Sequence, residues 1–247
     1  MPEEALVLVA HGSADPRAAA AIGELMPLVA RRATERGLSV PDLRAAYLGH
    51  AAPSVPQVMR AFGPDAQVTV LPMLLTAAYH SKTDIPRLLA RVSAGMRVTY
   101  GEPLGPHPLL LRALERRLPP AAFDNPAEVG VVLAAAGSSD PEANATVARL
   151  AAQWQAGSGW HAVRPAYASA ADPDPATAVT GLLRAGARRV VVASYLPAPG
   201  LFADRIRAAS QAAGASATSP ALGASPEVAD VVLDRYQEAG TRERAAA

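Results

Sequence analysis

Two histidines stand where short apolar runs give way to loops. His11 directly follows the apolar run at residues 5–10, and His80 lies in the loop after the run at 67–74. Imidazole is a ligand for divalent iron, cobalt, nickel or zinc and also a base near neutral pH. Two neutral histidines without a carboxylate make a weak, exchangeable metal site, which suits handing a metal over better than storing it. For either histidine alone, the alternative is a hydrogen-bonded loop or helix-capping residue.

The chain repeats itself, and the second copy lacks both histidines. The segment LVAHGSADP at 8–16 returns as LAAAGSSDP at 133–141, so Ala136 stands in place of His11 while the Gly-Ser-x-Asp-Pro turn is kept. In the loop that corresponds to that of His80, Phe202 stands at or near the position of the histidine. Their joint loss predicts that the two histidines act together in one site. Ser13 is kept in the copy, so it is expected to build the turn.

Alternation of short apolar runs with longer helical segments predicts an α/β fold with parallel sheets. We expect two similar lobes related by duplication, each a parallel sheet flanked by helices. The first would span 1–120 and carry the histidines, and the second, a degenerate repeat that completes the cleft, would span 126–247, after a linker at 118–126. Pro27 is expected to kink or divide the helix between 16 and about 36. The expected strands are 5–10, 43–48, 67–74, 96–100, 129–135, 161–167 and 188–196, and helices are expected at 16–36, from 53, at 83–92, 108–117 and 141–154, and from 176, 201 and 226.

The predicted strand ends bring the reactive side chains to one edge of the first sheet. Ligands bind beyond the carboxyl ends of strands in open parallel sheets, and His11 and His80 both follow such ends. His50 follows the second strand and is a candidate third group, the alternative being an ordinary loop residue. Lys82 is placed to meet an acidic ligand or to remain a solvated charge. Tyr79 is either a ligand contact or a core residue, and His107 and His161 are expected to be structural.

Composition excludes several classes of function. The formal net charge is +1, with 18% charged residues, which disfavours nucleic acid or a membrane surface as a partner. There are no cysteines, so disulfides, cysteine zinc sites and thiol nucleophiles are excluded. No signal peptide, membrane span or glycine-rich phosphate loop is recognisable. We therefore expect a cytoplasmic protein.

The segments LVAHGSADPR at 8–17 and PMLLTAAYHSKTDIP at 72–86 resemble the sirohydrochlorin chelatase family. The resemblance implies the two-lobed chelatase fold and insertion of Co²⁺ or Fe²⁺ into sirohydrochlorin, on the way to cobalamin or sirohaem. It implies that His11 and His80 bind the metal and accept protons, with no cofactor beyond the substrate metal. The remaining substrate contacts are expected from Ser13, His50, Tyr79 and Lys82. A single chain that holds both lobes is expected to be a monomer.

Two departures from the family pattern lie near the site. Ala14 replaces an arginine often found in this turn, and Gly49 stands where the family often has a carboxylate after the second strand. The second departure keeps open a non-catalytic metal or tetrapyrrole carrier on the same fold. A histidine phosphatase is disfavoured because Ala10, rather than arginine, precedes His11. A two-lobed solute-binding protein is expected to begin with a signal peptide, which the acidic start at 1–4 does not resemble.

Overall fold

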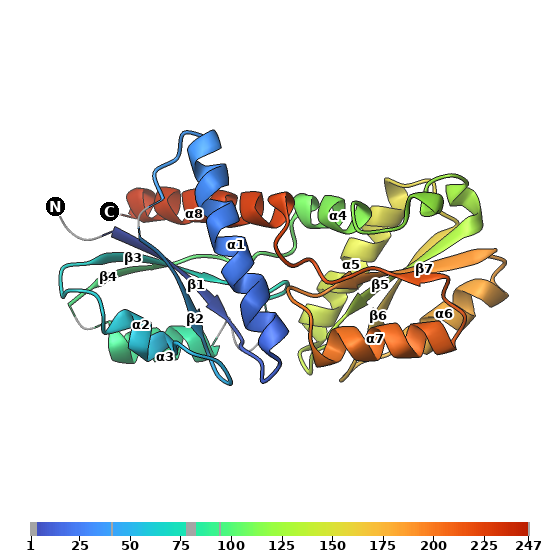
Figure 1. Ribbon diagram of the computed structural model, residues 1–247, viewed down its shortest axis with the longest axis horizontal. Coiled ribbons are helices and arrows are strands. Elements are labelled where there is room, and N and C mark those ends of the chain that lie inside the picture. The colour runs from blue at the N-terminus through green and yellow to red at the C-terminus, as the bar shows by residue number, and fades with distance from the viewer. Residues whose placement is uncertain (1–3, 41, 78–82, 94, 247) are drawn as a thin grey trace. The chain divides into compact units, whose positions relative to one another are not determined.

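The computed structural model describes residues 4–40, 42–77, 83–93 and 95–246, and in them two four-stranded parallel sheets (Figure 1). The strand orders are β2-β1-β3-β4 and β6-β5-β7-β8, so the second sheet repeats the topology of the first. The expected α/β fold class with two duplicated lobes is therefore confirmed. The strands are β1 (Glu4–Ala10), β2 (Asp42–Tyr47), β3 (Gln67–Pro72), β4 (Arg97–Tyr100), β5 (Val129–Ala135), β6 (Ala162–Tyr167), β7 (Arg189–Tyr195) and β8 (Ala217–Thr218).

Helices connect the strands in the expected order. The helices are α1 (Pro16–Glu35), α2 (Val55–Met59), α3 (Ile85–Val92), α4 (Pro108–Glu115), α5 (Pro141–Ala156), α6 (Pro175–Arg184), α7 (Leu201–Ala212) and α8 (Pro226–Ala246). The segment expected to be a linker contains two short 3-10 helices, η2 (Pro120–Ala122) and η3 (Pro126–Glu128). No helix in the described part of the chain is both long enough and apolar enough to span a bilayer.

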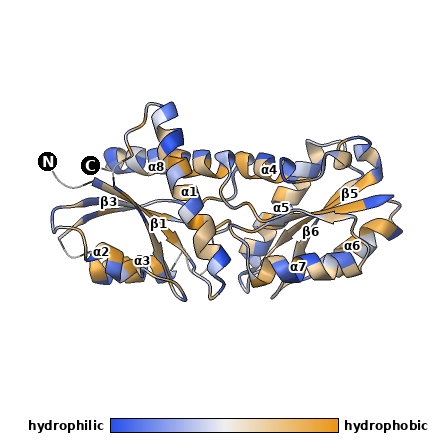
Figure 2. Cartoon of the chain, viewed as in Figure 1, coloured by the Kyte–Doolittle hydropathy of each residue, from blue (hydrophilic) through white to orange (hydrophobic). Residues whose placement is uncertain are grey.

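The central strands are apolar because both faces of each sheet are covered. Every residue of β5 is buried, and in β1 only Glu4 is exposed. Such continuous hydrophobic runs are typical of parallel strands with helices on both sides, and Figure 2 shows hydrophobic residues gathered along the strands. In the first sheet, Val7 and Val9 of β1 pack with Met59 of α2 and Ile85 of α3. Helices α1 and α8 cover the opposite face (Figure 1).

The second sheet is covered in the same way. Helices α6 and α7 lie on one face, where Val179 and Ile206 join the apolar cluster around Val132 and Val192. Helices α5 and α4 lie on the other face (Figure 1). The Trp154 indole of α5 donates to a carboxylate oxygen of Glu115 in α4 at 2.8 Å, which joins the two helices.

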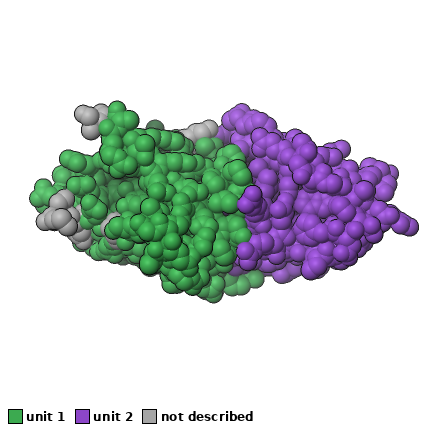
Figure 3. Space-filling view, turned by 90° about the horizontal axis from the view of Figure 1, so that it is seen from above, with its two compact units in different colours: residues 1–109, 224–247 green, residues 110–223 purple. Residues whose placement is uncertain are grey.

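The compact units do not coincide with the two halves of the sequence. Unit 1 comprises residues 1–109 and 224–247, and unit 2 comprises 110–223 (Figure 3). The lobes expected at 1–120 and 126–247 therefore differ from these units by their last helices: α8 belongs to unit 1, and α4 from Leu110 onward belongs to unit 2. The reason is packing, because α8 contacts α1, β3 and β4 of the first sheet.

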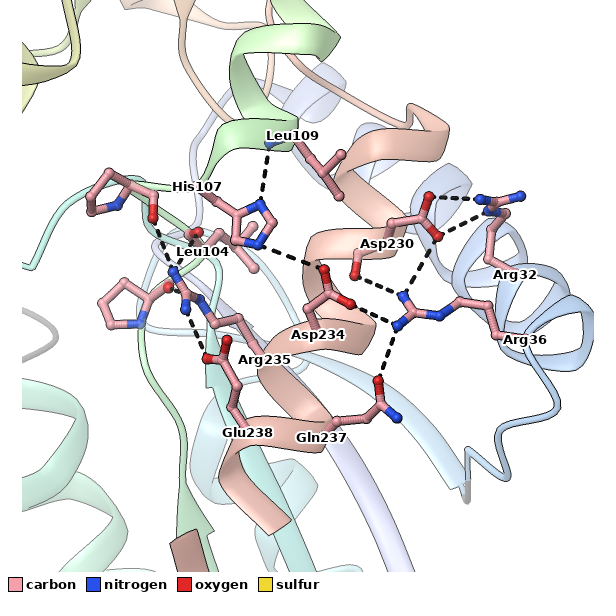
Figure 4. A network of polar contacts seen from close by, with 12 residues as sticks. Arg32, Arg36, Leu104, His107, Leu109, Asp230, Asp234, Arg235, Gln237 and Glu238 are labelled. Carbon is pink, nitrogen blue, oxygen red and sulfur yellow. Dashed lines mark hydrogen bonds and ion pairs between the residues drawn. The ribbon is translucent and has the colours of Figure 1, made fainter. Parts of the chain in front are cut away.

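Ion pairs hold α8 against α1 within unit 1. The Arg32 guanidinium donates to both carboxylate oxygens of Asp230, at 3.0 and 2.7 Å (Figure 4). Arg36, the residue that follows α1, donates to Asp234 at 2.7 Å and to Gln237 at 3.0 Å. These partially exposed pairs fix which face of α8 meets α1 and add little stability individually.

Two local features differ from the expectation. Helix α1 continues from Pro16 to Glu35 and is not divided at Pro27. Leu25, Leu28 and Val29 are buried on both sides of the proline, and this packing offsets the one hydrogen bond that proline removes. The two-residue strand β8, which extends the second sheet, was not predicted because two residues are too few to show a period.

Candidate active site

The turn after β1 holds His11 at the carboxyl end of the first sheet. The His11 side chain is exposed, and side-chain hydrogen bonds order the residues that follow it. The Ser13 hydroxyl oxygen accepts the backbone N–H of Asp15 at 3.1 Å. The Asp15 carboxylate caps α1 by accepting the backbone N–H of Arg17 at 3.0 Å, and the Arg17 guanidinium also donates to it. This side-chain hydrogen bond from Arg17 lowers the pKa of Asp15.

Glycine is required next to His11. Gly12 has a φ of 85°, a conformation that residues with a Cβ rarely adopt. A Cβ on Gly12 would lie 1.7 Å from the backbone oxygen of Gly49. The turn after β1 and the turn after β2 therefore touch through their backbones, with no room for a side chain between them.

The structure brings His50 to the same edge as His11. The backbone N–H of Leu48 donates to Ala10 at 3.0 Å, and that of Gly49 donates to the carbonyl oxygen of His11 at 3.1 Å. His50 follows with an exposed side chain and a φ of 59°, which is uncommon for a residue other than glycine. Its counterpart Ala170 in unit 2 has a φ of 58°, so this conformation belongs to the duplicated turn.

The third segment at this edge follows β3. The backbone N–H of Met73 donates to the carbonyl oxygen of Val9 at 2.8 Å, so residues after Pro72 begin beside the end of β1. Tyr79, His80 and Lys82 lie in this segment but outside the described residues, and their roles stay predictions.

The strand order creates a topological switch point at this edge. The chain leaves β1 for β2 on one side and returns to β3 on the other, so the connections after β1 and β3 diverge at the carboxyl edge. Open α/β sheets bind ligands at such topological switch points. His11 lies at this switch point, and sequence places His80 in the segment that forms its other side.

Two further histidines have structural contacts. His107 Nδ1 accepts the backbone N–H of Leu109 at 3.2 Å, and its Nε2 lies 3.6 Å from a carboxylate oxygen of Asp234 (Figure 4). Burial lowers the pKa of His107, and the nearby Arg235 lowers it further. His161 Nε2 lies 3.2 Å from the carbonyl oxygen of Ala185. Within the described ranges, no group of three or more metal-ligating side chains is assembled.

The corresponding turn of unit 2 is filled by its own side chains. Asn144 accepts the backbone N–H of Ser138 at 3.0 Å and donates to its carbonyl oxygen at 2.7 Å. The Ser169 hydroxyl donates to the carbonyl oxygen of Ala136 at 2.9 Å. Sequence reasoning missed this bracing. The only available signal was that an asparagine in α5 aligns with an alanine in α1.

Comparison with known proteins identifies a matching family and related chelatases. The sequence profile of the CbiX family matches residues 5–121 and 130–239. A sirohydrochlorin ferrochelatase of Priestia megaterium is 26% identical over 209 residues, which cover 83% of this chain and 77% of the relative. A sirohydrochlorin cobaltochelatase of the same organism is 26% identical over 211 residues, which cover 82% of this chain and 67% of the relative.

A solved structure shows the same fold. SirB from Bacillus subtilis with Fe³⁺ superimposes with a TM-score of 0.79 at 24% sequence identity, over 98% of each chain. The family profile matches well over half of the chain, in both of its halves. The resemblance to sirohydrochlorin chelatases expected from the two histidine segments is thereby confirmed, and the chain belongs to the CbiX family.

Proposed function

We propose that this protein is a sirohydrochlorin chelatase, which inserts Co²⁺ or Fe²⁺ into the tetrapyrrole during cobalamin or sirohaem biosynthesis. The observation that carries the proposal is His11, exposed at the switch point of the first sheet and replaced by Ala136 in the otherwise matching turn of unit 2. Chelatase relatives named for iron and for cobalt support the reaction class and leave both metals as candidates.

In this mechanism His11 and His80 bind the incoming metal and accept protons. Metal insertion requires two pyrrole nitrogens to lose their protons while a cation takes their place. Neutral imidazoles serve both needs, because they bind divalent iron or cobalt through nitrogen and take up a proton near neutral pH. A flat macrocycle turns its nitrogen lone pairs inward, so contacts elsewhere on the substrate must favour a distorted ring.

Ser13 is proposed to contact the substrate through its backbone. Its hydroxyl is engaged with Asp15, whereas its backbone N–H has no partner among the described residues. The matching N–H of Ser138 is bonded to Asn144. The Ser13 N–H lies just before α1, a helix of 20 residues whose dipole favours an anion at this end. A peripheral carboxylate of the tetrapyrrole is such an anion, and Lys82 and Tyr79 are proposed to bind the same molecule.

His50 is proposed to contact the substrate beside His11. Its turn is tied to that of His11 by the hydrogen bond from Gly49, so the two histidines follow neighbouring strand ends. A Cβ built on Gly49 meets no atom within 4 Å, so the chain has room for the missing carboxylate but does not supply it. His50 is the described titratable side chain best placed to take over that role.

Anaerobic absorbance spectroscopy of sirohydrochlorin with Co²⁺ or Fe²⁺ tests the proposal. The wild type should convert substrate catalytically, and His11→Ala should lose at least about 100-fold in turnover while keeping its fold. His161→Ala is the matched control, because this histidine contacts Ala185 rather than the proposed site. Full activity of His11→Ala would contradict the mechanism. Stoichiometric binding without turnover by the wild type would instead identify a metal or tetrapyrrole carrier.

Comparing the rates with the two metals identifies the one used. A partner beyond the tetrapyrrole and the metal is not expected. The monomeric state and the cytoplasmic location stay predictions.

A further inference from the structure

One exposed arginine stands at an unfavourable place in unit 1. Arg87 lies in the first turn of α3, and its side chain has no hydrogen-bond or ion-pair partner among the described residues. A cation is disfavoured in this turn, because the amino-terminal end of a helix carries a partial positive charge. No acidic residue lies in the turn, and Asp84 before it makes no side-chain capping hydrogen bond. The helix therefore gains no stability from Arg87.

A second arginine on the same helix adds to the cost. Arg91 lies four residues after Arg87, on the same face of α3, and is also exposed without a partner in the described part of the chain. Like charges at this spacing destabilise a helix. Arg91 has a structural explanation, because it lies in the last turn, where the helix dipole favours a cation. The helix itself offers no such explanation for Arg87.

The duplicated helix of unit 2 lacks this cation. Ile85 is the first buried residue of α3 and Ile206 that of α7, and in both helices the next buried residue follows four positions later, which fixes the register. In this register Ala208 stands in the place of Arg87, and α7 has an acidic residue, Asp204, in its first turn. The first turn of α7 thus follows the preference of the helix dipole, whereas that of α3 opposes it.

Arg87 lies at the end of α3 that is nearer the candidate site. Helix α3 lies beside α2 on one face of the first sheet (Figure 1). Residues 93–96 lead from its last turn to the start of β4 at the amino edge, so its first turn points to the carboxyl edge, where His11 lies. Helical side chains lean toward the amino-terminal end of their helix, which extends the reach of Arg87 in that direction. Arg87 and His11 both belong to unit 1.

We propose that Arg87 binds a peripheral carboxylate of the tetrapyrrole and thereby selects for a carboxylate-rich ring. The inference rests on the proposed function, because that function supplies the ligand. A guanidinium pairs with a carboxylate through two parallel hydrogen bonds. The bound anion also offsets the repulsion between Arg87 and Arg91 and interacts favourably with the helix dipole. The histidines act on the metal, and Arg87 decides which tetrapyrrole is held.

Metal-free binding titrations with three tetrapyrroles test this role. Sirohydrochlorin and uroporphyrin carry many peripheral carboxylates, whereas mesoporphyrin carries few. Arg87→Gln should raise the Kd of the first two by about fivefold, whereas the variant and the wild type should bind mesoporphyrin equally weakly. The effect should shrink in about 0.5 M salt, and Arg87→Lys, which keeps the charge, should recover part of the affinity.

Thermal unfolding separates binding from a structural role. Arg87→Gln removes a cation that the helix disfavours, so its Tm should equal or slightly exceed that of the wild type. Weaker binding of sirohydrochlorin combined with a lower Tm would show that Arg87 acts through the stability of α3, which contradicts the inference.

Two control variants remove the same charge elsewhere in unit 1. Arg97 is exposed at the start of β4, at the amino edge of the same sheet, and its side chain has no partner within the described ranges. Arg97→Gln should leave every Kd unchanged, and Arg91→Gln should raise the Kd of sirohydrochlorin by less than about twofold. Equal losses in Arg87→Gln, Arg91→Gln and Arg97→Gln would assign the effect to net charge and overturn the inference.

The same titrations distinguish the inference from the proposed function. If the wild type inserts metal and Arg87→Gln keeps the wild-type Kd for sirohydrochlorin, the inference is wrong while the proposed function stands. A wild type that neither binds nor metallates sirohydrochlorin overturns both.

Discussion

The turn after β1 and the turn after β5 have almost the same backbone. Gly12 and Gly137 have φ values of 85° and 84°, and a Cβ on either would lie 1.7 or 1.8 Å from the backbone oxygen of the neighbouring turn. In each turn a serine hydroxyl accepts the N–H of the aspartate two residues later, at 3.1 and 3.0 Å. Duplication has therefore preserved the scaffold to the level of single hydrogen bonds.

The two turns differ in what satisfies their polar groups. In unit 2, Asn144 and Ser169 bond to the backbone of Ser138 and Ala136. In unit 1, Ala19 and Gly49 stand at the corresponding positions and have no polar side chain. The turn after β5 is closed by its own side chains, whereas in the turn after β1 the Ser13 N–H has no partner among the described residues and His11 stands in place of Ala136. The proposed site is thus a turn that lacks the side-chain hydrogen bonds of its duplicate.

Adding a methyl group to each glycine gives the largest expected effect. Gly12→Ala and Gly137→Ala should each lower the free energy of unfolding by about 3 kcal/mol, because each forces a Cβ against a backbone oxygen at positive φ. Urea unfolding measures this cost. Only Gly12→Ala should also reduce metal insertion, by about 100-fold, since it displaces His11. An equal loss of insertion in Gly137→Ala would contradict the inference that only the turn after β1 takes part in the reaction.

Removing the bracing should affect stability alone. Asn144→Ala leaves the partially buried N–H and carbonyl of Ser138 without their partner and should cost about 2 kcal/mol of unfolding free energy. Insertion kinetics should stay at the wild-type level, because the turn after β5 has Ala136 in place of His11. Thermal unfolding and turnover measured on one preparation separate the two effects.

The reverse substitution, which introduces asparagine at the matching position of unit 1, is the control for Asn144→Ala. Ala19 follows Ser13 by six residues, as Asn144 follows Ser138. Ala19→Asn should stabilise unit 1 by about 0.5–1 kcal/mol while raising KM for sirohydrochlorin, because its amide would occupy the Ser13 N–H. A stabilised variant with unchanged KM would show that this N–H does not bind substrate.

A carboxylate introduced beside His11 should strengthen metal binding in unit 1, whereas the matching change in unit 2 should not. Gly49→Glu adds an oxygen ligand where a Cβ meets no atom within 4 Å, and it should raise affinity for Co²⁺ by about tenfold. Ser169→Glu places the same group in unit 2, where no histidine follows β5, and should leave affinity unchanged. Competition titration with a metal-binding dye compares the two, and equal gains would contradict a site at His11.

The smallest effect concerns a second pair of equivalent positions, the caps of α4 and α8. His107 accepts the N–H of Leu109 at 3.2 Å, whereas Ser225 accepts the N–H of Val228 at 3.4 Å and does not titrate. Burial lowers the pKa of His107 below its ordinary 6.5. The unfolded chain therefore binds this proton more readily, and stability should fall as the pH drops below about 6.5.

Above that pH His107 is neutral in both the folded and the unfolded chain, so its contribution to the free energy of unfolding should not change with pH. His107→Asn keeps an acceptor for the Leu109 N–H and should flatten the pH dependence, measured by urea unfolding between pH 5 and pH 8. Asp234 and Glu238 oppose the shift, which limits its size. An unchanged slope in His107→Asn would assign the pH dependence to other groups.

Sequence could predict the features that depend on local pattern. Apolar runs gave the order of the strands, and the repeated Gly-Ser-x-Asp-Pro segment predicted the turn that the hydrogen bonds of Ser13 and Asp15 now explain. The position of His50 beside His11 followed from strand ends sharing an edge. The partnership of His11 with His80 stays a prediction, because His80 lies outside the described residues.

Features that depend on tertiary choice could not be predicted. The apolar stripe of α8 shows that one face is buried but not which sheet it covers, and Asp230 and Asp234 become informative only once Arg32 and Arg36 are seen opposite them. Asn144 in a helix has no distinctive pattern until the turn it braces is known. Pro27 shows packing overriding a local helix-breaking preference.

The exchanged final helices bear on how the chain folds as it is synthesised. Unit 2 is one continuous stretch, 110–223, whereas unit 1 needs residues 224–247 from the opposite end of the chain. During synthesis on the ribosome, all of unit 2 is therefore made before α8. Until α8 follows, the face of the first sheet that α8 covers stays exposed. The usual N-terminal-first order is inverted. A nascent chain that stops at residue 223 holds His11 on an unfinished lobe, so the histidine segment reaches its final setting only after α8 has been synthesised and has packed on the first sheet.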